Sequence, residues 1–141
     1  MPTIQWDLTM STGVEAVDNQ HKQLIKWLND LLEAMSQGRA RGEIQALLAK
    51  LGGYAVTHFG YEEDCMTKYN CPVAAQNAEE HQHFVATFSS FNEEFEQGGA
   101  TAHLVVRMEN ELMRWLVGHI KRTDTQLLPC VKAKPAGSEG V

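Results

Sequence analysis

Four stretches of this 141-residue sequence repeat apolar side chains at the three- and four-residue spacing of an α-helix. No segment alternates apolar and polar residues over the length of a strand. Helices that each bury one apolar stripe, joined by short connections, pack side by side and antiparallel. We therefore predict an all-α fold: an antiparallel up-down-up-down four-helix bundle preceded by an irregular N-terminal arm. The stripes cover residues 24–35, 44–66, 73–95 and 104–120.

Local signals predict where the helices begin and where one of them is weak. Asp18 suits the N-cap of the first helix and Thr101 the N-cap of the fourth, because their side chains accept from free backbone N–H groups. We expect the second helix over residues 42–69. It contains the pair Gly52 and Gly53, each of which costs roughly 1 kcal/mol relative to alanine. Close approach of another helix, or a bend, would be a reason to tolerate that cost.

Length and charge restrict the class of protein. We expect one domain over residues 1–131, followed by a disordered tail over residues 132–141. The formal net charge of −6 argues against nucleic acid or an anionic membrane as a partner. No segment is long and apolar enough to span a bilayer, and the N-terminus lacks the pattern of a signal peptide. We expect a cytoplasmic protein, and a monomer because the stripes leave no large apolar face for a partner.

Three cysteines, Cys65, Cys71 and Cys130, form an odd and sparse set. They are not spaced as a zinc site, and all three cannot pair within one chain. A disulfide between Cys65 and Cys71 is conceivable, but reduced thiols without a special role are the simpler interpretation. Reduced thiols agree with a cytoplasmic location.

Polar side chains interrupt the stripes at positions that would face the inside of a bundle. His58 and Glu62 are four residues apart, so one turn of helix puts an imidazole and a carboxylate on the same face. Taken singly, such residues are better explained as hydrogen-bonded core histidines or surface carboxylates. Yet an unpaired buried carboxylate is costly, and every helix offers an imidazole. Together the residues are typical of a metal site in a bundle core. They are His21, His58, Glu62, His81, His119 and Asp124.

The fit of the last carboxylate depends on the end of the fourth helix. Asp124 follows His119 by five residues, so it reaches the same face only if the helix loosens or ends just before it. Two other histidines do not fit the set. His83 lies two residues past His81, on the opposite side of the helix, and His103 lies in the first turn of the fourth helix. We expect both at the surface.

A pattern in several parts runs through the chain. Its parts are Trp6 with Gly13-Val14-Glu15-Ala16-Val17-Asp18-Asn19-Gln20-His21, His58-Phe59 with Glu62-Glu63 and Met66, Glu80-His81 with Phe84, and Trp115-Leu116-Val117-Gly118-His119-Ile120 with Asp124. Any one part would be weak evidence, but the combination is specific. Over roughly residues 4–131 the chain resembles the hemerythrins, and among them the single-domain bacterial form.

This resemblance implies a non-haem centre of two iron ions joined by an oxo or hydroxo bridge. It implies reversible binding of O2, as a carrier, store or supplier, in a dry pocket that slows irreversible oxidation. The ligands implied are His21 and His58 for one iron, His81 and His119 for the other, and Glu62 and Asp124 as bridges. The residues expected to line the pocket are Leu28, Phe59, Trp115, Leu116 and Ile120.

One position departs from the family pattern. The family has a histidine one turn before the residue that is His81 here, and this chain has Asn77. Three outcomes are consistent with an amide there: its oxygen ligates the iron weakly, it holds a water that fills the position, or the second metal position is partly empty. We expect one of the first two. Because an amide oxygen is a poorer donor to Fe(II) than an imidazole, we also expect weaker metal retention and faster autoxidation.

Two alternative functions stay open. One is a di-iron enzyme acting on peroxide or nitric oxide at the position left by Asn77, and the other is a metal-binding module with an impaired site. We expect no enzyme, because the sequence offers no separate acid–base pair or substrate cleft. Glu63, Glu79, Glu80 and Cys65 are expected to be structural or solvated. No appended signalling domain fits this length, so we expect a carrier or supplier of O2 rather than a sensor.

Overall fold

The computed structural model describes residues 4–133, and every regular element in that range is helical. The predicted all-α fold is confirmed. The last helix includes two residues of the expected tail, and residues 134–141 of that tail lie outside the described range. The helices are α1 (Glu15–Ser36), α2 (Arg41–Lys68), α3 (Ala74–Gly98), α4 (Ala102–Met108), α5 (Arg114–Arg122) and α6 (Leu127–Ala133), and the short turns are η1 (Leu8–Met10), η2 (Glu109–Met113) and η3 (Asp124–Gln126).

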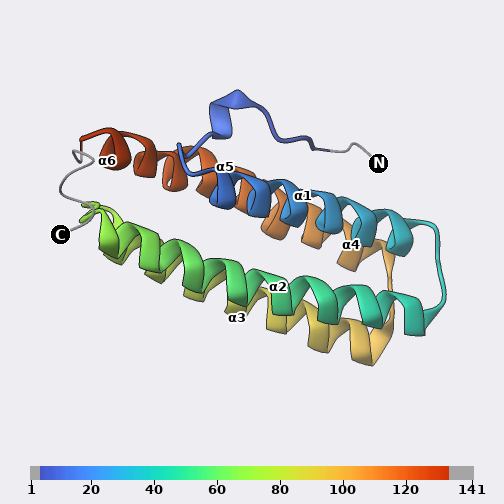
Figure 1. Cartoon of the computed structure of the whole chain (residues 1–141). Coiled ribbons are helices and arrows are strands. Elements are labelled where there is room, and N and C mark those ends of the chain that lie inside the picture. Colours follow the sequence, from blue (N-terminus) through green and yellow to red (C-terminus); the bar gives the residue numbers. More distant parts are fainter. Residues whose placement is uncertain (1–3, 134–141) are drawn as a thin grey trace.

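The long helices form an antiparallel bundle with short connections (Figure 1). α1 packs against α2, and α2 packs against α3. The stretch from α4 through η2 completes the bundle by packing against both α1 and α3. The N-terminal arm runs along the outside, where η1 contacts α5. Within residues 4–133, no helix combines the length and the apolar character that crossing a membrane requires.

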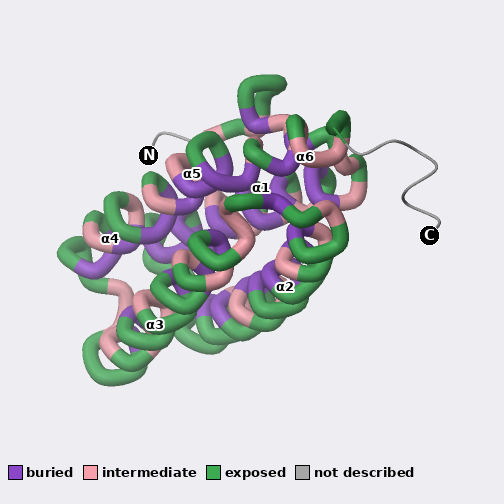
Figure 2. Tube along the Cα trace, turned by 90° about the vertical axis from the view of Figure 1, so that its left-hand side faces the viewer, coloured by how far each residue is buried: buried purple, intermediate pink, exposed green. Residues whose placement is uncertain are grey.

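Helices α1 to α5 each contribute buried side chains to a shared core (Figure 2). Leu28 of α1, Leu48 of α2, Phe91 of α3 and Met108 of α4 are buried together in one apolar cluster. Burying a side chain of this size fully stabilises the fold by about 1.5–3 kcal/mol relative to leaving it exposed. The predicted stripes therefore correspond to the buried faces and account for the association of the helices.

The N-terminal ends of α1 and α4 differ in how well they were predicted. Thr101 Oγ1 accepts from the backbone N–H of Leu104 at 3.1 Å, which confirms Thr101 as the N-cap of α4. The prediction for Asp18 is wrong, because α1 begins at Glu15 and Asp18 lies in its first turn. Asp18 Oδ1 instead accepts from the backbone N–H and the hydroxyl of Thr12, at 2.9 and 2.8 Å. It thereby fixes the arm where the chain enters α1.

The fourth helical stretch is not a continuous α-helix. A π-helical turn, η2, separates α4 from α5 and changes the direction in which the following side chains point. After this turn His119 and Ile120 are buried. α5 then ends at Arg122, and the 3-10 turn η3 begins at Asp124. The loosened end that Asp124 needed is confirmed, whereas nothing in the apolar spacing predicted the π turn.

Cys71 and Cys130 form a disulfide, with their Cα atoms 5.7 Å apart. Among residues 4–133, Cys65 is the one free cysteine. The expectation that all three are idle thiols is therefore wrong. The bonded pair lies 59 positions apart in the sequence, so only the fold brings the two thiols together. The bond ties the connection after α2 to α6. A cytoplasmic location, argued in part from reduced thiols, stays a prediction.

Gly52 lies where α2 and α3 approach each other closely. A Cβ atom at this position would lie 2.9 Å from Cε1 of the Phe88 ring. A Cβ atom at Gly53 would meet nothing within 4 Å. The close approach expected for the glycine pair is thus found at Gly52, whereas Gly53 faces open space.

The two glycines should respond differently to replacement by alanine. Gly53→Ala should stabilise the protein by roughly 1 kcal/mol, because alanine favours the helix and meets no atom. Gly52→Ala should be clearly less stable than Gly53→Ala, because the Phe88 ring must move. Thermal unfolding followed by circular dichroism measures both. Equal stabilisation by the two substitutions would contradict the close contact.

Candidate metal centre

The structure brings together all six side chains that the sequence placed in one set. His21 comes from α1, His58 and Glu62 from α2, His81 from α3, His119 from α5, and Asp124 from η3. Each residue is at most 2% exposed. Their ligand atoms form two groups that share Glu62 and Asp124, and within each group the atoms lie within 4.8 Å of one another.

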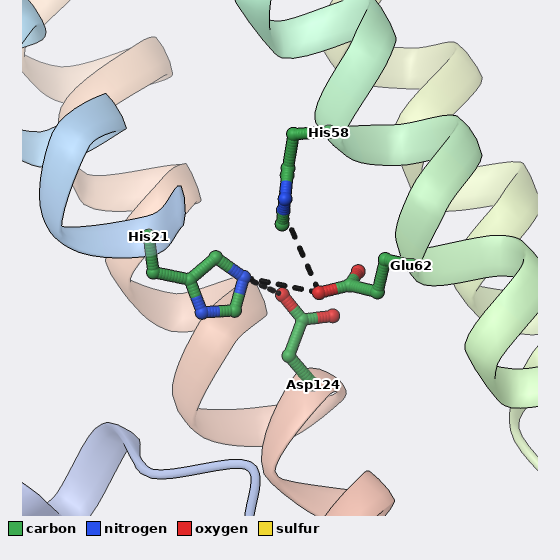
Figure 3. A group of neighbouring side chains, drawn as sticks. All are labelled: His21, His58, Glu62 and Asp124. Carbon is green, nitrogen blue, oxygen red and sulfur yellow. Dashed lines mark hydrogen bonds and ion pairs between the residues drawn. The ribbon is translucent and has the colours of Figure 1, made fainter. Parts of the chain in front are cut away.

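The first group joins His21 and His58 to the two carboxylates (Figure 3). His21 Nε2 lies 3.0 Å from Glu62 Oε2 and 3.0 Å from Asp124 Oδ2. His58 Nε2 lies 3.5 Å from the same Glu62 oxygen. One oxygen from each carboxylate therefore faces this pair of imidazoles.

The second group joins His81 and His119 to the other two oxygens. His81 Nε2 lies 3.0 Å from Glu62 Oε1. His119 Nε2 lies 3.0 Å from Asp124 Oδ1 and 3.9 Å from Glu62 Oε1. Each carboxylate thus offers one oxygen to each pair of imidazoles. Carboxylates arranged in this way can bridge two metal ions.

The contacts of Asp124 are close but are not aligned as hydrogen bonds. Its two oxygens lie 3.0 Å from His21 Nε2 and from His119 Nε2. Nevertheless, within residues 4–133, neither oxygen nor His119 Nε2 has a hydrogen-bond partner. Buried polar atoms in proteins are nearly always hydrogen-bonded or bound to a cation. A metal ion between these atoms would satisfy them, so the donor set fits a metal.

The pKa values of several side chains in the site differ strongly from their ordinary values. Burial acts to lower the pKa of His21, but its contacts with Asp124 and Glu62 outweigh burial and raise it to about 9. The same balance raises the pKa of His119 to about 10. Burial lowers the pKa of His58 to about 3, and burial together with the charge of Glu62 raises the pKa of Asp124. The two carboxylates therefore need positive charge beside them, which protons or metal cations can supply.

The outer nitrogens of three imidazoles have hydrogen-bond acceptors. An Nδ1–H that donates outward leaves the Nε2 lone pair directed at the centre, which is the orientation that a metal ligand needs. The donors and acceptors are His58 Nδ1 to Gln20 Oε1 at 2.6 Å, His81 Nδ1 to Glu63 Oε2 at 2.9 Å, and His119 Nδ1 to Glu80 Oε1 at 2.6 Å.

Glu63 and Glu80, which the sequence suggested were structural or solvated, therefore each accept a hydrogen bond from a histidine of the set. Glu80 Oε1 also accepts from the hydroxyl of Thr123 at 2.8 Å. One feature of the sequence could have indicated these hydrogen bonds: Gln20, Glu63 and Glu80 are each next in sequence to a residue of the predicted set. A neighbouring position points about 100° away around its helix, and here that direction leads to a histidine of another helix.

Asn77 lies one turn before His81 on α3 and is fully buried. Among residues 4–133, neither its Oδ1 nor its Nδ2 has a hydrogen-bond partner. A buried amide without partners typically costs about 1–3 kcal/mol. This position, one turn from a histidine of the site, therefore has polar atoms that an additional ligand or ion would satisfy.

Aromatic side chains of the predicted pocket cover two of the histidines. The Phe59 ring stacks on His81 with centroids 4.0 Å apart, and the Trp115 ring stacks on His119 at 4.8 Å. The other expected lining residues, Leu28, Leu116 and Ile120, are buried in the core. His83 and His103 are exposed, as predicted.

The chain is similar over most of its length to known proteins. A family model described as the hemerythrin HHE cation binding domain matches residues 12–131. A bacteriohemerythrin from Methylococcus capsulatus is 32% identical over 123 residues, which are 86% of this chain and 91% of that protein. A bacteriohemerythrin from Pseudomonas aeruginosa is 26% identical over 132 residues, covering 94% of this chain and 84% of that protein.

A solved structure shares the fold as well. The crystal structure of a wild-type hemerythrin superposes with a TM-score of 0.79 at 28% sequence identity. The match covers 92% of this chain and 98% of that chain. This chain and that hemerythrin therefore share the same helix bundle.

Because Glu62 belongs to both groups, its loss should affect both metal positions. We expect Glu62→Ala to abolish retention of both ions, and His58→Ala to weaken mainly the group that contains His21. Metal per chain, measured by elemental analysis after gel filtration, checks this. Asp64→Ala is the control, since Asp64 is an exposed carboxylate on the same helix. Full metal content in the Glu62→Ala protein would show that the site is elsewhere.

Proposed function

The chain belongs to the hemerythrin family, and we propose that it is a non-haem di-iron protein that binds O2 reversibly. The observation that supports this most directly is the pair of buried carboxylates, Glu62 and Asp124, each shared between two pairs of imidazoles. Imidazole nitrogens with bridging carboxylate oxygens are a typical ligand set for two iron ions. When bound, two ferrous ions supply the electrons that make O2 binding possible.

We assign the protein groups as follows. His21 and His58 hold one ion, His81 and His119 hold the other, and both carboxylates hold the two ions together. The geometry supports this assignment because each carboxylate presents one oxygen to each group, and because both Asp124 oxygens have no other partner within residues 4–133.

Apolar side chains surround much of the site and limit the access of water. Leu28, Phe59, Leu116 and Ile120 are buried, and the stacked rings of Phe59 and Trp115 cover His81 and His119. A dry, apolar surround disfavours the separation of charge that accompanies irreversible loss of an electron to O2. We propose that these side chains line the O2 pocket and slow autoxidation.

We propose a binding role rather than turnover, as a carrier, store or local supplier of O2. Among the proteins matched over most of their length are bacteriohemerythrins, which supports this choice. A cytoplasmic location and a monomeric state stay predictions.

Reversibility is the property that tests the proposal. Protein loaded with Fe(II) without air should develop a visible absorption band on exposure to O2, and the band should disappear when O2 is removed under argon. The spectrum should recover over several cycles. A band that never reverses, or product formed in excess of the iron present, would instead favour the enzyme alternative.

We further propose that Asn77 occupies a position beside the ion held by His81 and His119, either as a weak oxygen ligand or by holding a water. The support is its place one turn before His81 and the lack of a partner, within residues 4–133, for either amide atom. An amide oxygen binds Fe(II) less well than an imidazole does. Retention of that ion should therefore be the weaker point of the site.

Asn77→His should restore a third imidazole to that ion. We expect more iron per chain after dialysis against a chelator and a longer lifetime of the O2-bound protein, both by a factor of several. Gln97→His adds an exposed histidine to the same helix and is the control. No change in either quantity for Asn77→His would place Asn77 away from the metal.

A further inference from the structure

The hydrogen bonds behind the histidines are distributed unequally between the two halves of the site. In the half of His21 and His58, His58 donates to the neutral amide oxygen of Gln20 at 2.6 Å. His21 Nδ1 has no partner among the residues that the structure describes. In the half of His81 and His119, both imidazoles donate to carboxylates.

His81 donates to Glu63 at 2.9 Å, and His119 donates to Glu80 at 2.6 Å. Besides Glu62 and Asp124, which both halves share, this half has two carboxylates behind its histidines, and among residues 4–133 no carboxylate is hydrogen-bonded to the outer nitrogen of His21 or His58. It is also the half in which Asn77 stands where a third imidazole would bind. The extra negative charge lies on the side of the site that has lost a nitrogen donor.

We propose that Glu63 and Glu80 compensate for Asn77 by strengthening the two imidazoles that remain. Each carboxylate holds its imidazole in one orientation and increases the electron density on the Nε2 atom that faces the ion. The ion between His81 and His119 is thereby retained, and its oxidised form is favoured relative to the ion between His21 and His58. This inference rests on the proposed di-iron site, but it does not require that the protein bind O2.

Glu80 should have the larger effect of the two. Its side chain is 19% exposed, and besides His119 it accepts from Thr123 Oγ1 and from Gln76 Nε2, each at 2.8 Å. The guanidinium of Arg122 approaches only to 4.0 Å and is 60% exposed, so solvent screens it. These bonds hold the Glu80 carboxylate in place behind His119.

Glu63 is more open to solvent. Its side chain is 40% exposed and lies in a groove of about 410 Å³ between α2 and α3, which His81 also lines. Water in this groove screens the charge of Glu63 and weakens its influence on His81. The link between His81 and Glu63 is therefore more open to solvent than the link between His119 and Glu80.

A purely structural role predicts a different outcome from this proposal. If the two carboxylates only anchored the imidazoles, then glutamine, which keeps an oxygen acceptor of the same size, would replace them without consequence. If the charge matters, Glu80→Gln and Glu63→Gln should weaken one of the two ions although the hydrogen bond is kept. Loss of such a partner typically costs about 10- to 100-fold in metal affinity.

The experiment uses the full chain loaded with 57Fe(II) without air. Chelator titration should release one ion from Glu80→Gln at a chelator concentration about 10- to 100-fold lower than from the parent, with a smaller shift for Glu63→Gln. Mössbauer spectra should show the loss of one of two iron environments, and the reduction potential of the affected ion should become more positive. Helical content by circular dichroism should stay unchanged.

Two control variants sharpen the test. Glu79→Gln removes the same charge one position away from Glu80, at an exposed site, and should leave both ions in place. Gln20→Glu puts a carboxylate behind His58 and should strengthen the other ion. If Glu79→Gln matched Glu80→Gln, the effect would be one of net charge, and the proposal would be overturned.

The link to Asn77 is tested by combining substitutions. If the carboxylates compensate for the missing imidazole, Glu80→Gln should cost several-fold less metal affinity in the Asn77→His background than in the parent. Equal costs in both backgrounds, or equal loss of both ions, would overturn the proposal. If the substitutions change metal affinity as expected but the protein does not bind O2, only the proposed O2 function is rejected. If the chain retains no iron at all, both the O2 function and the role of Glu63 and Glu80 are rejected.

Discussion

Two carboxylates buried in an apolar helix bundle are the constraint on which the arrangement of the rest depends. Glu62 and Asp124 are almost completely shielded from solvent, where an uncompensated negative charge is very unfavourable. Four imidazoles surround them, and each approaches a carboxylate oxygen to between 3.0 and 3.5 Å. Apolar side chains fill the rest of the core around them, so among residues 4–133 these imidazoles are the groups placed to balance the two negative charges.

The C-terminal part of the bundle is built to meet this constraint. A regular helix would not bring two side chains five positions apart to the same point, and His119 and Asp124 are so spaced. The π turn before α5 and the 3-10 turn η3 after it depart from α geometry on both sides of His119. The disulfide between Cys71 and Cys130 then joins α6, which follows η3, to the connection between α2 and α3.

The site consists of two halves with the same number of histidines but different surroundings. Within residues 4–133, the side-chain amide of Asn77 has no hydrogen-bond partner, whereas His81 and His119 donate to Glu63 and Glu80. The side of the site with His81 and His119 therefore combines two features: a buried amide that lacks a side-chain partner among residues 4–133, and two acidic residues hydrogen-bonded to its histidines. We propose that these two features are connected.

The sequence alone determined the features that depend on local periodicity. Helical spacing predicted the four stripes, the all-α bundle and the inward positions of His58 and Glu62, because neighbouring turns of a helix repeat the same direction. It could not predict what depends on which helix lies opposite. The partners of His81 and His119, the pairing of Cys71 with Cys130, and the π turn were decided by tertiary packing. Contacts between distant segments leave no periodic trace in the chain, since they depend on how whole helices are rotated and placed against one another.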